Sequence, residues 1–182
     1  MIFYTSDWHI IHKKIIRLTN RPFLSVDEMT HEMIRRYHAC VSDTDTCYFL
    51  GDIFVAPRDG KTHGEEAILE QLSGRKVLIL GNHDDDLVRR IDLSKYFERV
   101  EECLNIVDDG HPVTLCHYPL ADAPALREGG FMIHGHLHNN PLPGGEKWPD
   151  RMLNACVEVN RYAPATLEQL IQNNRLFRCM NR

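Results

Sequence analysis

The sequence predicts an α/β fold in which a two-layer β-sheet core (a sandwich) is flanked by α-helices. Three observations support this prediction. Apolar strand segments alternate with helical segments in the first half of the chain. Strand segments follow one another more directly in the second half. Polar motifs rich in Asp, His and Asn stand directly after several strands, where open α/β sheets bind their ligands.

Length and composition indicate one globular domain over residues 1–182, with 43% hydrophobic and 26% charged residues. The net charge of −5 disfavours a broad surface for polynucleotides. The chain lacks the apolar run of about 18 residues that a membrane span needs. Its first residues also lack the basic region and long apolar core of a signal peptide. We therefore expect a cytoplasmic protein whose mature chain begins with its first strand.

Six cysteines occur in the chain, and none forms a C-x-x-C pair of the kind found in zinc knuckles. A cytoplasmic location predicts reduced thiols. Several of them lie in apolar runs and are expected to be small core residues. They are Cys40, Cys47, Cys103, Cys116, Cys156 and Cys179.

The first elements are predicted from apolar runs and capping residues. Ile2–Thr5 reads as a short strand, and Ile11–Leu18 reads as a short helix that Asn20-Arg21-Pro22 breaks. Ser25 is an N-cap with Glu28 at the capping-box position, so a second helix should run from there to about Ala39.

Two further apolar strands are expected over Cys47–Leu50 and Lys76–Leu80. A helix over His63–Leu72, closed by Gly74, separates them.

Strands dominate the second half of the prediction. Phe97–Val107 and Pro112–Cys116 are expected to be joined by a turn at Asp108-Asp109-Gly110. Further strands are predicted over Phe131–Ile133 and Met152–Val159.

The remaining segments of the second half are a loop and a helix. Ala165–Asn173 should form a terminal helix. Asn139–Pro149 is rich in Pro and Gly and reads as a loop beside the site.

Five motifs concentrate residue types that bind metals. Asp7 and His9 flank one residue at a strand end, so both can turn toward one ion, and the carboxylate of Asp52 can bridge two cations with its two oxygens. Mixed nitrogen and oxygen ligation suits Mn, Fe, Zn or Co better than Ca or Mg. The absence of thiolates argues against a Cys-rich structural zinc site. The motifs are Asp7-Trp8-His9, Gly51-Asp52, Gly81-Asn82-His83-Asp84, Cys116-His117 and Gly135-His136-Leu137-His138.

In this order, the five motifs resemble those of the calcineurin-like metallophosphoesterase superfamily. The stretch from Thr5 to His9, the turn Asn20-Arg21-Pro22-Phe23 and the run Cys116-His117-Tyr118-Pro119-Leu120 are similar to a small single-domain bacterial and phage branch of predicted phosphoesterases. The resemblance spans nearly the whole chain, and the set of motifs is far more specific than any one of them.

The resemblance implies a dinuclear site for two divalent metal ions, with Mn²⁺ favoured and Fe, Zn, Co or Ni as alternatives. It implies hydrolysis of a phosphomonoester or phosphodiester by a metal-bridging hydroxide, with His83 as a non-ligand that contacts the phosphoryl oxygen or protonates the leaving group. Asp52 would bridge the two metals. One metal would be bound by Asp7, His9 and His138, and the other by Asn82, His117 and His136.

One position departs from the family pattern. Many members carry an aspartate three residues after the bridging aspartate, where it pairs with the catalytic histidine, and this chain has Val55. The residue that orients His83 is therefore open. Asp84 could orient a neighbour, but we expect it to cap the helix that begins near Asp85.

Three residues are predicted to contact substrate. His12 lies three residues after His9 and is interpreted as a residue that contacts the substrate or supports a metal ligand. Arg21 is interpreted as part of a phosphate-binding rim, because an arginine fork matches phosphate, although a solvated helix face is the alternative. Tyr118 could stack on an aromatic leaving group or belong to the core.

The predicted function is a metal-dependent phosphoesterase whose substrate is a phosphorylated small molecule or nucleotide. Two alternatives stay open: a catalytically silent, metal-bound interaction scaffold and a nuclease acting on short RNA or DNA. The full set of expected ligands and His83 argue against the scaffold. The length and negative charge of the chain argue against a large nucleic-acid surface.

Overall fold

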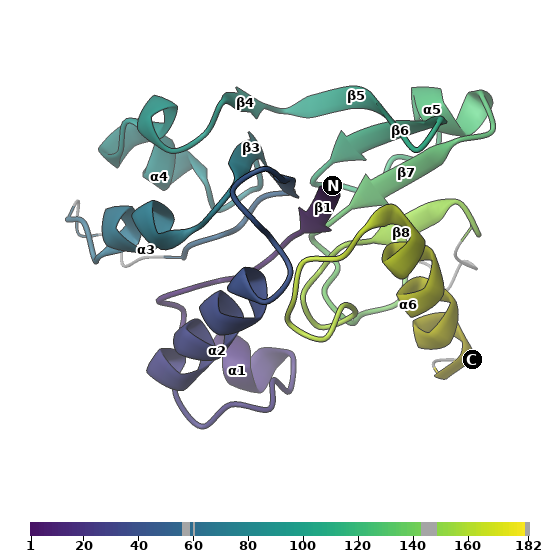
Figure 1. The fold of residues 1–182 in the computed structure, drawn as a ribbon. Coiled ribbons are helices and arrows are strands. Elements are labelled where there is room, and N and C mark those ends of the chain that lie inside the picture. Colours follow the sequence, from purple (N-terminus) through teal and green to yellow (C-terminus); the bar gives the residue numbers. More distant parts are fainter. Residues whose placement is uncertain (56–58, 60, 143–148, 181–182) are drawn as a thin grey trace.

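A computed structural model describes residues 1–55, 59, 61–142 and 149–180. Its core consists of two four-stranded sheets that pack face to face, with helices on their outer sides (Figure 1). This arrangement confirms the predicted two-layer α/β architecture.

The first sheet is entirely parallel. Its order is β1 (Ile2–Thr5), β2 (Thr46–Phe49), β3 (Arg75–Ile79) and β4 (Arg99–Glu101). Parallel neighbours need crossover connections, which the intervening helices provide. These are α1 (Ile15–Leu18), α2 (Val26–His38), α3 (Glu65–Gln71), α4 (Asp85–Arg90) and the 3-10 turn η1 (Leu93–Lys95).

The second sheet begins with an antiparallel hairpin of β5 (Cys103–Asp108) and β6 (His111–Cys116). The predicted turn joins them, with Asp109 and Gly110 at positive φ. β7 (Phe131–His134) and β8 (Met152–Asn154) continue the sheet in parallel. Its helices are α5 (Pro124–Arg127), which lies against β6 and β7, and α6 (Leu167–Met180), which lies against β8 and β1 (Figure 1).

Alternation along the strands separates the core into layers. Phe3, Phe49 and Leu78 point to the outer face of the first sheet, where they pack with residues of α2, α3 and α4. Their neighbours Tyr4 and Ile79 point to the opposite face and join apolar residues of the second sheet. The space between the sheets is therefore filled by alternate residues of the same strands.

The start of α2 follows the predicted capping pattern. The Ser25 hydroxyl accepts a hydrogen bond from the Glu28 amide, and the Glu28 carboxylate accepts one from the Leu24 amide. The Ser25 side chain thus satisfies one free amide of the first turn, and the Glu28 carboxylate holds the residue before the cap, which together define where this helix begins.

Four predicted elements differ from the structure by more than two residues at one of their ends. The predicted strand Phe97–Val107 is two strands in two different sheets, β4 and β5, because the chain crosses between the layers at this point. The strand expected over Met152–Val159 ends at Asn154, whose side chain accepts a hydrogen bond from the Cys156 amide. The helix expected from Ile11 begins only at Ile15, and the terminal helix extends to Met180.

The expectation of six reduced thiols is wrong for one pair. Cys103 and Cys116 form a disulfide between directly opposed positions of β5 and β6, which brings their Cα atoms to 4.5 Å. Cys47 and Cys156 are buried free thiols, as predicted for core residues.

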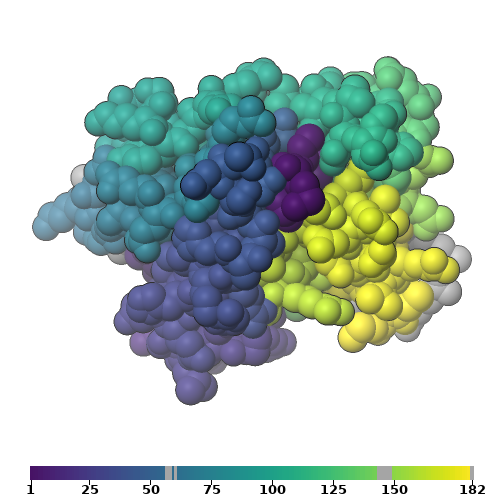
Figure 2. All heavy atoms as spheres, in the orientation of Figure 1, coloured from purple at the N-terminus to yellow at the C-terminus, as the bar shows by residue number. Residues whose placement is uncertain are grey.

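The N-terminal strand lies beside the segment that leads into the last helix. β1 pairs with β2 on one side, and Tyr4 exchanges backbone hydrogen bonds with Ala165 just before α6 on the other. Figure 2 shows the purple N-terminal residues between the blue segment that leads from α2 to β2 and the yellow C-terminal region. Within the described ranges, no helix has the length and apolar character needed to cross a bilayer.

Candidate metal centre

The predicted ligands converge at the carboxyl ends of strands from both sheets. Asp7 follows β1, Asp52 follows β2 and Asn82 follows β3, while His117 and His136 follow β6 and β7. The loops are tied together by backbone hydrogen bonds, including Asp7 to Gly51 and Gly135 to His117. The structure thus brings side chains from five separate motifs into one place.

The backbone at these residues is unusual. Five of the seven predicted ligands have left-handed φ values between 50° and 69°, a region that costs an L-residue with a Cβ about 1–2 kcal/mol. Such conformations cluster at functional sites, where the surrounding structure holds a side chain in a required direction. The five are Asp7, His9, Asp52, His136 and His138.

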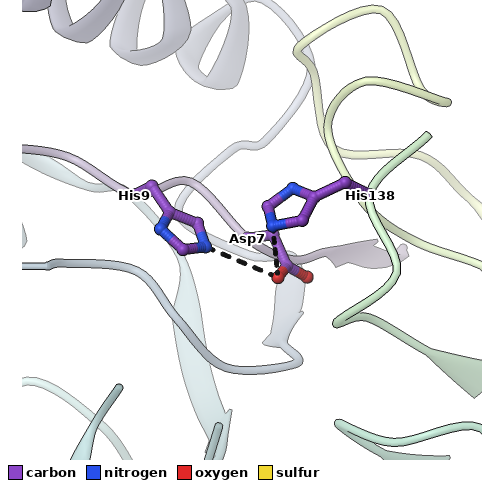
Figure 3. Close-up of side chains that lie close together, drawn as sticks. All are labelled: Asp7, His9 and His138. Atoms are coloured by element: carbon purple, nitrogen blue, oxygen red, sulfur yellow. Dashed lines mark ion pairs between the residues drawn. The ribbon is translucent and has the colours of Figure 1, made fainter. Parts of the chain in front are cut away.

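The first predicted ligand group consists of Asp7, His9 and His138 (Figure 3). Both Nε2 atoms face the same carboxylate oxygen, Asp7 Oδ1, from 3.6 Å for His9 and 3.7 Å for His138. Asp7 Oδ2 is engaged elsewhere, since it accepts hydrogen bonds from Ser6 Oγ at 2.5 Å and the His136 amide at 2.9 Å. Among the described residues, Asp7 Oδ1 and His9 Nε2 are buried without a hydrogen-bond partner. A cation between these atoms would satisfy both.

The second predicted group consists of Asn82, His117 and His136. His117 Nδ1 lies 2.7 Å from the Leu50 carbonyl, which can only accept, so Nδ1 carries the proton and Nε2 presents a lone pair. That lone pair faces the Asn82 carbonyl oxygen at 3.0 Å, and His136 Nδ1 lies 2.9 Å from the same oxygen. Two acceptors in contact repel each other unless a cation is shared between them, so this donor set fits a metal.

Asp52 lies between the two groups. Its Oδ2 is 3.7 Å from His9 Nε2 and 3.6 Å from His117 Nε2. Its Oδ1 accepts a hydrogen bond from the His83 amide at 2.9 Å. We predicted a bridge through both oxygens, but the structure directs only Oδ2 toward both groups because the His83 amide holds the other.

Asp84 does not cap α4 as predicted. Its side chain is fully buried, and Oδ2 accepts hydrogen bonds from the amides of Gly81 (2.8 Å) and Asp52 (3.0 Å). Burial and the nearby Asp52 charge raise the pKa of Asp84 to about 7, although the two amide hydrogen bonds act in the opposite direction. Asp84 therefore holds two ligand-bearing loops together, which is the orienting role that we considered second.

The electrostatic balance of the site favours an ionised Asp7. Burial alone would raise the pKa of this carboxyl, but the imidazoles of His9, His117 and His138 outweigh it and hold the pKa well below its ordinary value. The site thus places a buried anionic carboxylate among the imidazole rings of the predicted ligands.

Arg21 is placed differently from the prediction. Its side chain is fully buried, so it cannot form a phosphate-binding rim. The guanidinium forms an ion pair with Glu158 and donates to the carbonyl groups of Asp7 and Trp8.

The other two predicted substrate residues lie at the site. His12 Nδ1 is 3.3 Å from His9 Nδ1, and the half-buried ring is partly accessible. Tyr118 is 45% exposed, and its ring contacts both His117 and His136 at centroid distances of 5.1 and 4.7 Å. Both positions are compatible with substrate contact, which stays a prediction.

His83 stands at the open side of the centre. Its side chain is 39% exposed, and its Nε2 is 4.0 Å from Asp52 Oδ2. It lines a cavity of about 230 Å³ together with Phe54, Val55 and Asn82. In the described part of the chain, no side chain forms a hydrogen bond with the His83 ring, in keeping with a valine at position 55.

Sequence reasoning missed two residues that support the first ligand group. Ser6 holds Asp7 Oδ2, and Glu158 contacts the ring of His138. Ser6 precedes the first motif directly and could have been found by its position. Glu158 lies 20 residues after His138, and no local spacing connects the two.

Comparisons with known proteins identify relatives that match three quarters or more of the chain. The uncharacterized protein MJ1445 of Methanocaldococcus jannaschii is 34% identical over 99% of this chain and 96% of its own length. The gene 66 protein of mycobacterium phage L5 is 32% identical over 75% of this chain and 77% of its own. No protein-family model matches the chain.

A solved structure shares the fold. The protein of unknown function AQ665 from Aquifex aeolicus has a TM-score of 0.73 and 27% identity, covering 94% of this chain and 98% of its own. Together with the ordered motifs and the two-sheet fold, these relatives assign the chain to a family. It belongs to one family with MJ1445 and the phage gene 66 proteins, and its ordered motifs resemble those of the calcineurin-like metallophosphoesterase superfamily.

Proposed function

We propose that the protein is a metal-dependent hydrolase of phosphoesters with a dinuclear centre. The observation that carries this proposal is a pair of buried ligand atoms without a hydrogen-bond partner, Asp7 Oδ1 and His9 Nε2. Asp7 Oδ1 faces the ring of His138, and His9 Nε2 faces Asp52 Oδ2. A folded protein rarely leaves buried polar atoms unsatisfied unless something binds there.

Two half-sites would hold the cations, with Asp52 Oδ2 directed at both. Asp7, His9 and His138 form one half-site, and Asn82, His117 and His136 form the other. Bound divalent cations would polarise the phosphoryl oxygens and lower the pKa of water, which supplies a nucleophile at neutral pH. Manganese is the favoured ion, with Fe, Zn, Co or Ni as alternatives, because the donors mix nitrogen with oxygen.

The protein side chains would position the ester. His83 faces the cavity beside Asn82 and would donate a proton to the leaving oxygen or a hydrogen bond to the phosphoryl group. Tyr118 and His12 lie at opposite ends of the ligand set, where they would contact the organic part of the substrate. A phosphorylated small molecule or a nucleotide suits a protein with a net charge of −5, because bound cations would supply the positive charge that attracts a phosphate.

A substrate screen tests the proposal. Protein loaded with Mn²⁺ should hydrolyse a member of a library of phosphomonoesters, phosphodiesters and nucleotides. Asp52→Ala is the negative control because it removes the shared ligand. His83→Ala should lower turnover while metal content stays nearly unchanged. Stoichiometric metal binding without turnover on any ester would instead favour a scaffold, and loss of metal from His83→Ala would refute its role as a non-ligand.

A further inference from the structure

A buried carboxylate sits directly behind one of the proposed metal ligands. Glu158 Oε1 lies 3.0 Å from His138 Nδ1, on the opposite side of the ring from the Nε2 atom that faces Asp7. The Glu158 side chain is only 2% exposed. An ionised carboxylate can only accept hydrogen bonds, so the contact requires a proton on Nδ1, and in the neutral ring Nε2 then carries the lone pair.

Besides His138, Arg21 is the only described basic side chain that forms an ion pair with Glu158. The guanidinium donates from Nε at 3.0 Å and from Nη2 at 2.7 Å to Glu158 Oε1. Both side chains are almost fully buried, so the pair is shielded from water and fixed in one geometry.

The same guanidinium also holds the backbone of the first motif. Nη1 donates to the Trp8 carbonyl at 2.6 Å, and Nη2 donates to the Asp7 carbonyl at 2.7 Å. Asp7 and the following His9 adopt the left-handed conformation, which needs support from its surroundings. Arg21 therefore connects the turn that carries Asp7 and His9 to the carboxylate that contacts His138.

We propose that Glu158 and Arg21 are positioning residues of the first metal half-site. Glu158 sets the tautomer of His138 so that the Nε2 lone pair faces the cation. Arg21 holds Glu158 in place relative to the turn that bears Asp7 and His9. The inference rests on the proposed metal-binding function. Outer-shell partners of this kind commonly change metal affinity by about 10–100-fold when they are replaced.

Glu158→Gln is the most informative variant because it preserves shape and changes only the hydrogen-bonding capacity. The amide group can donate as well as accept, so it no longer forces the proton onto His138 Nδ1. Glu32→Gln is the matched control, since Glu32 likewise forms ion pairs with arginine, here Arg35 and Arg36, but on the surface of α2.

The first readout uses the metal-free protein and does not depend on activity. Long-range ¹H–¹⁵N spectra of labelled histidines, recorded at alkaline pH, distinguish the two neutral tautomers. We expect His138 to carry its proton on Nδ1 in the wild type and in Glu32→Gln, and to shift toward the Nε2 tautomer in Glu158→Gln. An unchanged His138 signal in Glu158→Gln would overturn the inference, whether or not the protein binds metal.

The second readout is the affinity for Co²⁺ alone, followed by its visible absorption. Glu158→Gln should weaken binding by about 10–100-fold, whereas Glu32→Gln should match the wild type. Arg21→Lys keeps a positive charge beside Glu158 but cannot reach both carbonyls, so it should weaken Co²⁺ binding while His138 keeps its tautomer. Equal affinity in the wild type and Glu158→Gln would contradict the positioning role. Failure of the wild type to bind Co²⁺ or Mn²⁺ would instead contradict the proposed function.

Discussion

Asp84→Asn separates the structural role of the buried Asp84 carboxyl from its charge. Asn preserves the oxygen that accepts the Gly81 and Asp52 amide hydrogen bonds, and it cannot ionise. Its NH₂ group would occupy the position of Oδ1, which is buried without a partner among the described residues. That mismatch should destabilise the variant by about 1–3 kcal/mol at every pH.

The titration of Asp84 adds a pH-dependent difference in unfolding free energy, and this difference favours the Asn variant. Burial raises the pKa of Asp84 from 3.8 to about 7, so the folded state binds a proton that the unfolded state releases. The unfolding free energy of the wild-type protein therefore falls as the pH rises from about 4 to about 7, and this loss is complete above that range. Since one pKa unit corresponds to about 1.4 kcal/mol, the full loss amounts to roughly 4 kcal/mol. The Asn variant should not show it.

The assay is urea unfolding of metal-free protein at a series of pH values, for wild type and Asp84→Asn. The difference between their unfolding free energies should move in favour of the variant across this range. Asp85→Asn, which alters an exposed neighbouring carboxylate, is the control. Mn²⁺ should shrink the pH-dependent difference, because nearby cations favour the ionised carboxylate. A difference that stays constant with pH would refute the assignment of a raised pKa to Asp84.

Three further substitutions test the packing of the site and the core. Gly81→Ala should weaken Co²⁺ binding by about 10-fold or more in a spectroscopic titration, because a Cβ there would overlap the Asp52 carboxylate. Ser6→Ala should lower the unfolding free energy by about 1.5–3 kcal/mol in urea, since it removes a hydrogen bond to the ionised Asp7; an unchanged value would show that the contact contributes nothing. Leu69→Ala should cost about 2–5 kcal/mol in the same assay while Co²⁺ affinity stays at the wild-type value, because this fully buried residue lies in the layer between the first sheet and its helices.

Local signals in the sequence predicted most of the first sheet correctly. The strands β1, β2 and β3 are apolar runs followed by polar motifs, and both features are visible without knowledge of distant contacts. The start of α2 was equally clear, because the Ser25 cap and Glu28 act within one helical turn. Such features depend on residues that are close in the sequence, so periodicity and capping chemistry suffice to find them.

Boundaries in the second half were harder to predict for a physical reason. The segment Phe97–Val107 was predicted as one strand, yet its two parts pair with β3 and β6 in different layers. Pairing partners are chosen by the packing of whole sheets, which no local pattern records. The disulfide between Cys103 and Cys116 has the same origin, since the register of β5 against β6 places the two residues opposite each other.

By itself, the sequence determined the residue types of the candidate centre and their order, because each motif lies at the end of its own strand. Only the tertiary structure decided how these residues are supported. It buried Arg21 against Glu158, which lies 137 positions away, and turned Asp84 toward the amides of two loops. The reason is physical: a buried charge must find its partner in three dimensions, and that partner is supplied by whichever segment packs beside it.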